Sequence, residues 1–256
     1  MLLYGNNTIS YLLLLIVIVF ALNVKAERYR PYDYYKVSIR WPKSYCLSED
    51  VVGRGYECEE PILANFTVHG VWPMYSHEII VRPYRDDPRC TETRPMPPES
   101  ITYDLLGEML DDMKKYWPNV VTRTQEYNEN FWQYQFENHG MCFENPDKPK
   151  HYFRSGLKVL KQYDFLEILR RSKKPYPHKQ VRPRDLRFNA VQYKQIVKGG
   201  LGGVEPQILC NTDSNGTLQF GEIRVCFDKY NEMMDCPYSF QGCGDWRNAK
   251  LNFPRP

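Results

Sequence analysis

The sequence predicts an α+β fold organised as a single domain. Strand-like and helix-like segments are interleaved along the chain, without the regular βαβ rhythm that builds a parallel sheet. The 256 residues are 42% hydrophobic and 25% charged, which is enough apolar surface for a core and excludes a disordered chain. The net charge of +3 is too small for a protein that coats duplex nucleic acid.

The first 26 residues have the character of a signal peptide. The apolar run over residues 11–22 is too short to span a bilayer. Val24 and Ala26 place small side chains just before a cleavage site at Glu27. We therefore expect a signal peptide over 1–26 and a secreted single domain over 27–256, without stable membrane association. No Lys or Arg precedes the apolar run, so an uncleaved membrane anchor is the alternative.

The cysteines agree with an oxidising compartment. All eight lie after the cleavage site, and their even number favours four disulfides over a metal site, because no CxxC pair occurs. They are Cys46, Cys58, Cys90, Cys142, Cys210, Cys226, Cys236 and Cys243. Asn65 and Asn215 each begin a glycosylation sequon, as is common in secreted proteins.

The N-terminal half begins with two expected strands. Residues 34–41 alternate and are β-rich, and residues 64–71 form a second candidate that should stop at Pro73. Five prolines over residues 83–99 predict a loop. A helix capped by Ser100 and ended by Pro118 should follow. Its apolar face would consist of Ile101, Leu105, Leu106, Met109, Leu110 and Met113.

The C-terminal half has helical and then strand-like character. Helices are expected over residues 131–140 and 151–171, and again over 185–198 after a basic, proline-rich stretch at 170–187. That stretch could steer RNA or recognise a partner, although such runs are more often solvated loops. Two final strands are expected over residues 207–211 and 220–228.

Two of the five histidines have unusual settings. His69 ends an apolar strand segment, FTVHGVWP, where the chain turns at the rim of a sheet. His139 ends the run FWQYQFENHG, in which Gln135 lies one turn earlier on the same helix face. Asn138 is adjacent, and Phe131 lies one turn further back. A lone histidine is more often a structural residue, and spacing alone does not bring these two together.

The two histidine segments together resemble the ribonuclease T2 family. FTVHGVWP is similar to its FTIHGLWP-like first active-site segment, and FWQYQFENHGMC to its EWxKHGTC-like second segment. The resemblance includes WPKSYC, the Trp117-Pro118 pair and the segments ILCN, VCFD and DCP, and so covers residues 41–256. Plant members, including the self-incompatibility ribonucleases, also have an NFT sequon before the first histidine. The resemblance implies a central antiparallel sheet with several helices.

The resemblance also implies cleavage of single-stranded RNA, with no cofactor and no metal ion. His139 would be the base that takes the proton from the ribose 2′-OH, and His69 the acid that protonates the departing 5′-oxygen. The product is a 2′,3′-cyclic phosphate. Trp72 and Phe131 would offer apolar faces to the base and ribose, with core packing as the alternative for both. The scheme needs one neutral and one protonated imidazole, which favours mildly acidic conditions.

Two residues depart from the family pattern. The family has Glu where this chain has Gln135, and Lys where it has Asn138. Losing one preorganised group at a transition state commonly costs ~10²–10³ in rate. Gln135 would still donate a hydrogen bond to a phosphoryl oxygen, and Asn138 would contact the substrate. We expect a ribonuclease of reduced activity. The alternative is a catalytically impaired homologue that binds RNA or a protein partner, for example in self-incompatibility.

The disulfide pairing is implied by the plant members of the family. It is Cys46–Cys58, Cys90–Cys142, Cys210–Cys243 and Cys226–Cys236. The second pair would tie the loop after the first active-site segment to the end of the second, and so help to hold His69 and His139 together.

Overall fold

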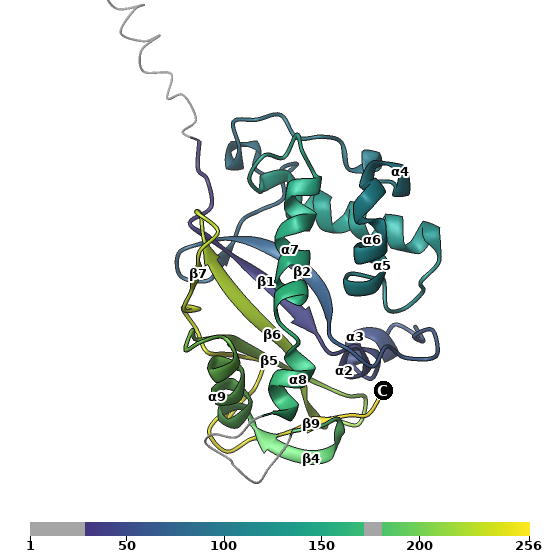
Figure 1. Ribbon diagram of the computed structural model, residues 1–256, viewed down its shortest axis with the longest axis vertical. Coiled ribbons are helices and arrows are strands. Elements are labelled where there is room, and N and C mark those ends of the chain that lie inside the picture. The colour runs from purple at the N-terminus through teal and green to yellow at the C-terminus, as the bar shows by residue number, and fades with distance from the viewer. Residues whose placement is uncertain (1–28, 172–180) are drawn as a thin grey trace, which may run out of the picture.

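The fold is built on a curled antiparallel sheet with helices packed on one face (Figure 1). The computed structural model describes residues 29–171 and 181–256. The expected signal peptide over 1–26 and residues 172–180 of the basic stretch lie outside the described residues. Within the described part, no helix is both long and apolar enough to cross a membrane.

Strand β1 (Tyr34–Arg40) lies at the centre of the sheet. It pairs antiparallel with β2 (Thr67–Tyr75) on one side and with β6 (Leu218–Asp228) on the other. β5 (Gln207–Thr212) continues the sheet beyond β6, again antiparallel. Short strands complete it: β3 (Ile79–Ile80), β4 (Arg184–Asn189), β7 (Met233–Met234), β8 (Phe240–Gln241) and β9 (Lys250–Phe253). The expected α+β class with a central antiparallel sheet is confirmed.

The helices are short and gather mainly on one face of the sheet. Figure 1 shows α7 (Lys150–Gln162) lying across β2 and β1. The remaining α-helices are α2 (Pro42–Cys46), α3 (Glu49–Val52), α4 (Tyr103–Leu106), α5 (Leu110–Tyr116), α6 (Gln125–Asn138), α8 (Phe165–Arg170) and α9 (Ala190–Gly200). Four 3-10 turns connect them: η1 (Pro88–Cys90), η2 (Pro98–Ser100), η3 (Gly107–Met109) and η4 (Gly140–Cys142).

The two faces of β1 differ in chemistry although both are buried. Side chains alternate along a strand, so Val37 and Ile39 point into the aromatic core beneath the helices. Lys36, Ser38 and Arg40 occupy the other face and are only 1%, 0% and 4% exposed. This second face is therefore a buried polar layer, which requires hydrogen-bond partners.

The second strand does not stop at Pro73, contrary to expectation. β2 runs through Pro73, which lies opposite Tyr35 of β1. The Pro73 carbonyl accepts a hydrogen bond from Val81 N (3.1 Å), so this edge of the residue faces away from β1. The ring nitrogen points to the same edge, where the β1 ladder needs no donor. A proline is tolerated in a strand under this condition.

The helix expected between Ser100 and Pro118 is interrupted, and its cap lies later. Thr102, not Ser100, caps α4, because its hydroxyl accepts from Leu105 N at 3.2 Å. Gly107 then adopts a φ of +51°, which a helix does not permit, and α5 begins only at Leu110. The helical path ends at Trp117, directly before Pro118, as expected.

Three other expected helices have different bounds. α6 begins at Gln125, six residues before the expected start, and ends at Asn138. The helix expected over 151–171 is two helices, because Asp164 caps α8 through a hydrogen bond from Glu167 N (2.9 Å). The helix expected over 185–198 is wrong in its first turn, since β4 pairs with β9 there and α9 begins at Ala190.

Four disulfides join the expected pairs: Cys46–Cys58, Cys90–Cys142, Cys210–Cys243 and Cys226–Cys236. The Cys90–Cys142 bond fixes the 3-10 turn that follows α6 to the loop after β3.

Candidate active site

A β-bulge turns His69 onto the buried polar face of the sheet. Ser38 of β1 pairs with Gly70 and Ile39 pairs with Val68, so His69 is an extra residue on β2. A bulge re-aims the side chain of the inserted residue. The backbone at this point is held from the core side, where Trp117 Nε1 donates to the His69 carbonyl at 3.2 Å.

The His69 imidazole is bound by a buried carboxylate. Its Nδ1 lies 2.7 Å from Glu222 Oε1, and Glu222 is 8% exposed. The other carboxylate oxygen accepts from Ser38 Oγ at 2.6 Å and from the Arg224 guanidinium at 3.3 Å. Glu222 therefore fixes the orientation of the ring and leaves Nε2 as the nitrogen that can face a substrate.

Glu222 is held in its charged form. Burial alone would raise the pKa of its carboxyl, but the contacts with His69, Arg224 and Ser38 outweigh burial and hold the pKa well below its usual range. An ionised carboxylate accepts hydrogen bonds only, so the proton at the contact resides on His69 Nδ1.

The polar face continues away from Glu222 as a chain of hydrogen bonds. Arg224 Nη1 donates to Gln207 Oε1 at 3.3 Å, and the same oxygen accepts from Lys36 Nζ at 3.0 Å. Lys36 is also paired with Glu78. Two of the three buried cations on this face are therefore neutralised by carboxylates.

His139 has the opposite environment. It follows the last residue of α6, and its backbone N–H donates to the Gln135 carbonyl at 3.1 Å. Its Nδ1 is buried and has no hydrogen-bond partner. Burial and, to a lesser degree, the nearby His69 lower the pKa of His139 to about 3. This imidazole is therefore neutral throughout the mildly acidic range.

Trp72 lies close to both imidazoles. Its ring centroid is 5.2 Å from that of His69 and 6.0 Å from that of His139. The Arg224 guanidinium lies over the indole at 4.6 Å. The structure thus brings both histidines to one place, with Trp72 beside each of them.

Gln135 approaches β2 at Gly70. A Cβ at residue 70 would lie 2.3 Å from Gln135 Oε1 and 2.6 Å from Trp72 Nε1. Only glycine leaves room for both polar atoms, which are buried and without hydrogen-bond partners. Gln135 is 3% exposed, so its amide is shielded from solvent where α6 approaches Gly70.

One tyrosine connects the two histidine segments from behind. The Tyr152 hydroxyl of α7 lies 3.1 Å from the Val71 carbonyl of β2 and 3.3 Å from the Gln135 carbonyl of α6. It therefore sets the distance between the strand that holds His69 and the helix that ends at His139.

The other two expected site residues lie at the edges of this arrangement. Asn138 is half-buried, but its amide is already engaged: Oδ1 accepts from Arg85 at 3.0 Å, and Nδ2 donates to the Tyr134 carbonyl at 2.8 Å. Phe131 is half-buried on α6, and the guanidinium of Arg40 lies 5.4 Å from its ring centre. Both remain candidates for substrate contact.

The remaining described histidines lie elsewhere. His77 is exposed in the turn between β2 and β3, and His151 pairs with Glu144 at 3.2 Å. Across residues 29–171 and 181–256, no three His, Cys, Asp or Glu side chains come together as potential metal ligands.

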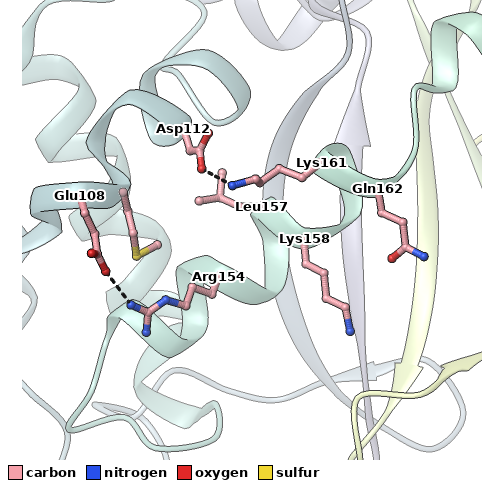
Figure 2. A pocket seen from close by; sticks show the side chains of 8 residues that line it. Glu108, Asp112, Arg154, Leu157, Lys158, Lys161 and Gln162 are labelled. Carbon is pink, nitrogen blue, oxygen red and sulfur yellow. Dashed lines mark hydrogen bonds and ion pairs between the residues drawn. The ribbon is translucent and has the colours of Figure 1, made fainter.

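A hollow of about 620 Å³ lies on the outer side of α7 (Figure 2). Four of the charged side chains that line it form two ion pairs: Arg154 with Glu108 at 3.3 Å, and Lys161 with Asp112 at 2.6 Å. The opposite side of α7 packs on β2 through Tyr152. This hollow is therefore separated from the histidines by the helix itself.

The geometry supplies a proton acceptor and a proton donor close to one indole. His139, whose Nδ1 is buried, is a neutral base, and His69 is an imidazole whose protonated form has a carboxylate partner. Such a pair suits general acid–base catalysis near or below neutral pH. Sequence reasoning missed Glu222, Ser38 and Arg224. Their only signal was the alternation of polar and apolar residues in two strands.

Comparisons with known proteins identify a family. The model of the Ribonuclease T2 family matches residues 32–236. Ribonuclease 1 of Arabidopsis thaliana is 24% identical over 225 residues, covering 87% of this chain and 86% of that protein. Ribonuclease S-6 of Pyrus pyrifolia is 29% identical over 217 residues, with coverages of 82% and 83%.

Solved structures give the same fold. Ribonuclease MC1 from bitter gourd seeds superimposes with a TM-score of 0.65 at 21% identity, over 87% of this chain and all of that one. The self-incompatibility-associated SF11-RNase of Nicotiana alata gives 0.66 at 24% identity, over 88% of this chain and all of that one. At these identities the likeness establishes the fold.

Proposed function

This chain belongs to the ribonuclease T2 family, and from that premise we propose that it cleaves single-stranded RNA by attack of the ribose 2′-OH on the neighbouring phosphorus. The observation that supports this function is the pair of imidazoles close to Trp72, one kept neutral by burial and the other bound to a carboxylate.

The two histidines have distinct roles in this reaction. Neutral His139 accepts the proton of the 2′-OH, and the oxygen forms a bond to phosphorus. Protonated His69 gives its Nε2 proton to the 5′-oxygen as the P–O5′ bond breaks, leaving a 2′,3′-cyclic phosphate. The Glu222 carboxylate stabilises the imidazolium before transfer and keeps the ring aimed. Glu222 is thus a positioning residue for His69.

The rate is expected to be low for the family because of two amides. Gln135 presents a neutral amide at the position where the family has a glutamate. The Asn138 amide is already hydrogen-bonded to Arg85 and Tyr134. Weaker stabilisation of the crowded phosphorane follows. The double change Gln135→Glu with Asn138→Lys is expected to raise kcat at least about tenfold. An unchanged kcat would show that the amides do not limit the reaction.

The direct test is an RNA digest at mildly acidic pH. We expect fragments with 2′,3′-cyclic phosphate ends, detectable by mass spectrometry, and no cleavage by His69→Ala or His139→Ala. His151→Ala is the matched control, because this imidazole lies at the surface beside Glu144 and should leave the rate unchanged. The absence of cleavage by the wild type at high enzyme concentration would reject a ribonuclease.

A second candidate is a binding factor that has lost catalysis. The engaged Asn138 amide is the observation in its favour. In that case His69→Ala and His139→Ala retain the biological activity, for example recognition of a protein partner in self-incompatibility.

Secretion and glycosylation belong to the same proposal. The chain is directed out of the cell by residues 1–26, and Asn65 and Asn215 receive glycans. Both asparagines precede or lie in turns and are solvent-accessible, which supports modification. Treatment of the secreted protein with an endoglycosidase should lower its mass by two glycans. The variants Asn65→Gln and Asn215→Gln should each lose only one glycan on this treatment.

A further inference from the structure

Two buried polar groups without partners lie opposite each other on β1 and β2. Arg40 and Thr67 are directly paired across the ladder and are 4% and 1% exposed. Arg40 Nε and Thr67 Oγ1 are both buried, and neither has a hydrogen-bond partner. Both residues point to the polar face of the sheet, where His69 and Glu222 also lie.

Aromatic rings from two elements enclose the Arg40 guanidinium. It lies 4.4 Å from the ring centre of Tyr45 on α2 and 5.4 Å from that of Phe131 on α6. Phe131 precedes Gln135 by one helical turn and His139 by two, so these three side chains share one face of α6. Arg40 therefore lies at one end of the row of residues that leads to the catalytic histidines.

The charge of Arg40 is not neutralised. Lys36 is paired with Glu78 and Arg224 with Glu222. In the described part of the chain, no carboxylate lies within ion-pair distance of Arg40. Its electrostatic neighbours are the Tyr45 hydroxyl, to which it is hydrogen-bonded, and Glu222, which lies opposite it on β6 and is already paired with Arg224. A buried guanidinium without a counter-ion is unfavourable. A neutral side chain of similar size would avoid this cost, so the charge needs an anion from outside the protein.

We propose that Arg40 and Thr67 form an anion site for a backbone phosphate of the RNA, next to the phosphate that the histidines attack. This inference rests on the proposed ribonuclease function and adds a subsite to it. The guanidinium N–H groups and the Thr67 hydroxyl donate to non-bridging phosphate oxygens. Arg40 on β1 thus supplies a positive charge to the site, which the amide of Asn138 does not.

Binding can be measured apart from cleavage with a 2′-O-methyl RNA oligonucleotide, which has no free 2′-OH nucleophile. We expect Arg40→Gln to weaken binding about tenfold or more, since a hydrogen bond to a charged group is lost. The slope of log affinity against log salt should fall by about 0.7, the value for one phosphate contact on a single strand. Arg40→Lys keeps the charge and should keep the slope. Arg154→Gln on the outer side of α7 is the matched control and should change neither quantity.

Two further measurements separate a phosphate site from a structural role. A series of oligonucleotides with single neutral methylphosphonate linkages should locate one position at which the wild type loses affinity and Arg40→Gln does not. Thermal unfolding should show that Arg40→Gln is no less stable than the wild type, because an uncompensated buried charge has been removed. Thr67→Val should weaken binding several-fold, and Asn65→Gln controls for the sequon that the valine also removes.

The proposal is overturned if the salt slope of Arg40→Gln equals that of the wild type. A loss of affinity confined to oligonucleotides of one base would indicate a base carbonyl as the ligand and would also overturn it. So would a lowered melting temperature without a change in affinity. Because the ligand is not cleaved, these results are independent of whether the digest finds ribonuclease activity.

Discussion

Replacing Gln135 by glutamate should move the acid limb of the pH–rate profile to higher pH. In the wild type, burial and the neighbouring His69 lower the pKa of His139 to about 3. The base is then neutral down to this pH, so kcat/KM should decline only below about pH 3–4 on the acid side. A carboxylate at residue 135 favours the protonated form of His139 and opposes the effect of burial.

The size of the shift follows from the helix geometry. Side chains four residues apart on a helix lie about 6 Å from each other. Two unit charges at that distance interact by about 3 kcal/mol at an effective dielectric constant of about 20. This energy corresponds to about two pKa units, so the acid limb should move from about pH 3 to about pH 5. The indole Nε1 of Trp72, a buried donor without a partner, favours an ionised carboxylate beside it.

The assay is kcat/KM on a short RNA between pH 2.5 and 8 at constant ionic strength. Asn130→Asp is the matched control, because it adds the same charge on an exposed position of α6 and should leave the limb in place. A wild-type acid limb near pH 6.5, the ordinary value for histidine, would refute the assignment of His139 as a buried neutral base. An unmoved limb in Gln135→Glu would refute the electrostatic argument.

Three further changes test how the site is built, each by kcat/KM and urea unfolding. Glu222→Gln removes the carboxylate that holds His69, so it should lower kcat/KM by about 10². It also leaves buried Arg224 without a counter-ion, which should lower the unfolding free energy by about 3 kcal/mol or more. Wild-type kinetics in this variant would exclude a positioning role for Glu222. Gly70→Ala should cost about 1–3 kcal/mol, because its Cβ would lie 2.3 Å from Gln135 Oε1, whereas Gly199→Ala meets nothing within 4 Å and should stabilise by about 0.5–1 kcal/mol. Tyr152→Phe removes the link between two backbone carbonyls and should cost about 1–3 kcal/mol; equal stability would show that the link is dispensable.

The histidine segments could be found in the sequence because each is a short local pattern. His139 directly follows α6, whereas His69 lies at a bulge inside β2, and only the family resemblance indicated that the two lie near one another. The predicted first and last residues of the helices and strands were less accurate. Thr102 and Ser100 are equally good caps by type, and only the observed hydrogen bond to Leu105 distinguishes them. The strand at 184–189 depends on pairing with residues more than sixty positions later, which no local pattern contains.

The carboxylate behind His69 could not be predicted for a different reason. The alternation of polar and apolar residues along β1 and β6 indicates which residues share a face, but it does not indicate whether that face is exposed to solvent. Polar residues such as Ser38 and Glu222 would ordinarily be assigned to solvent. They are buried here because they bond to each other and because His69 and Arg224 complete the hydrogen bonds of Glu222. Burial of a polar face is a tertiary property.

The net charge of the whole chain differs from the local charge on the buried polar face. A net charge of +3 over 256 residues gives little attraction for RNA. On the buried face, however, two of three cations are neutralised by carboxylates, and the remaining positive charge resides on Arg40. A charge in a low-dielectric environment acts more strongly than one in water. The amides at positions 135 and 138 therefore do not determine the electrostatics of this site alone, because in this chain an unneutralised charge comes from a strand and not from the helix.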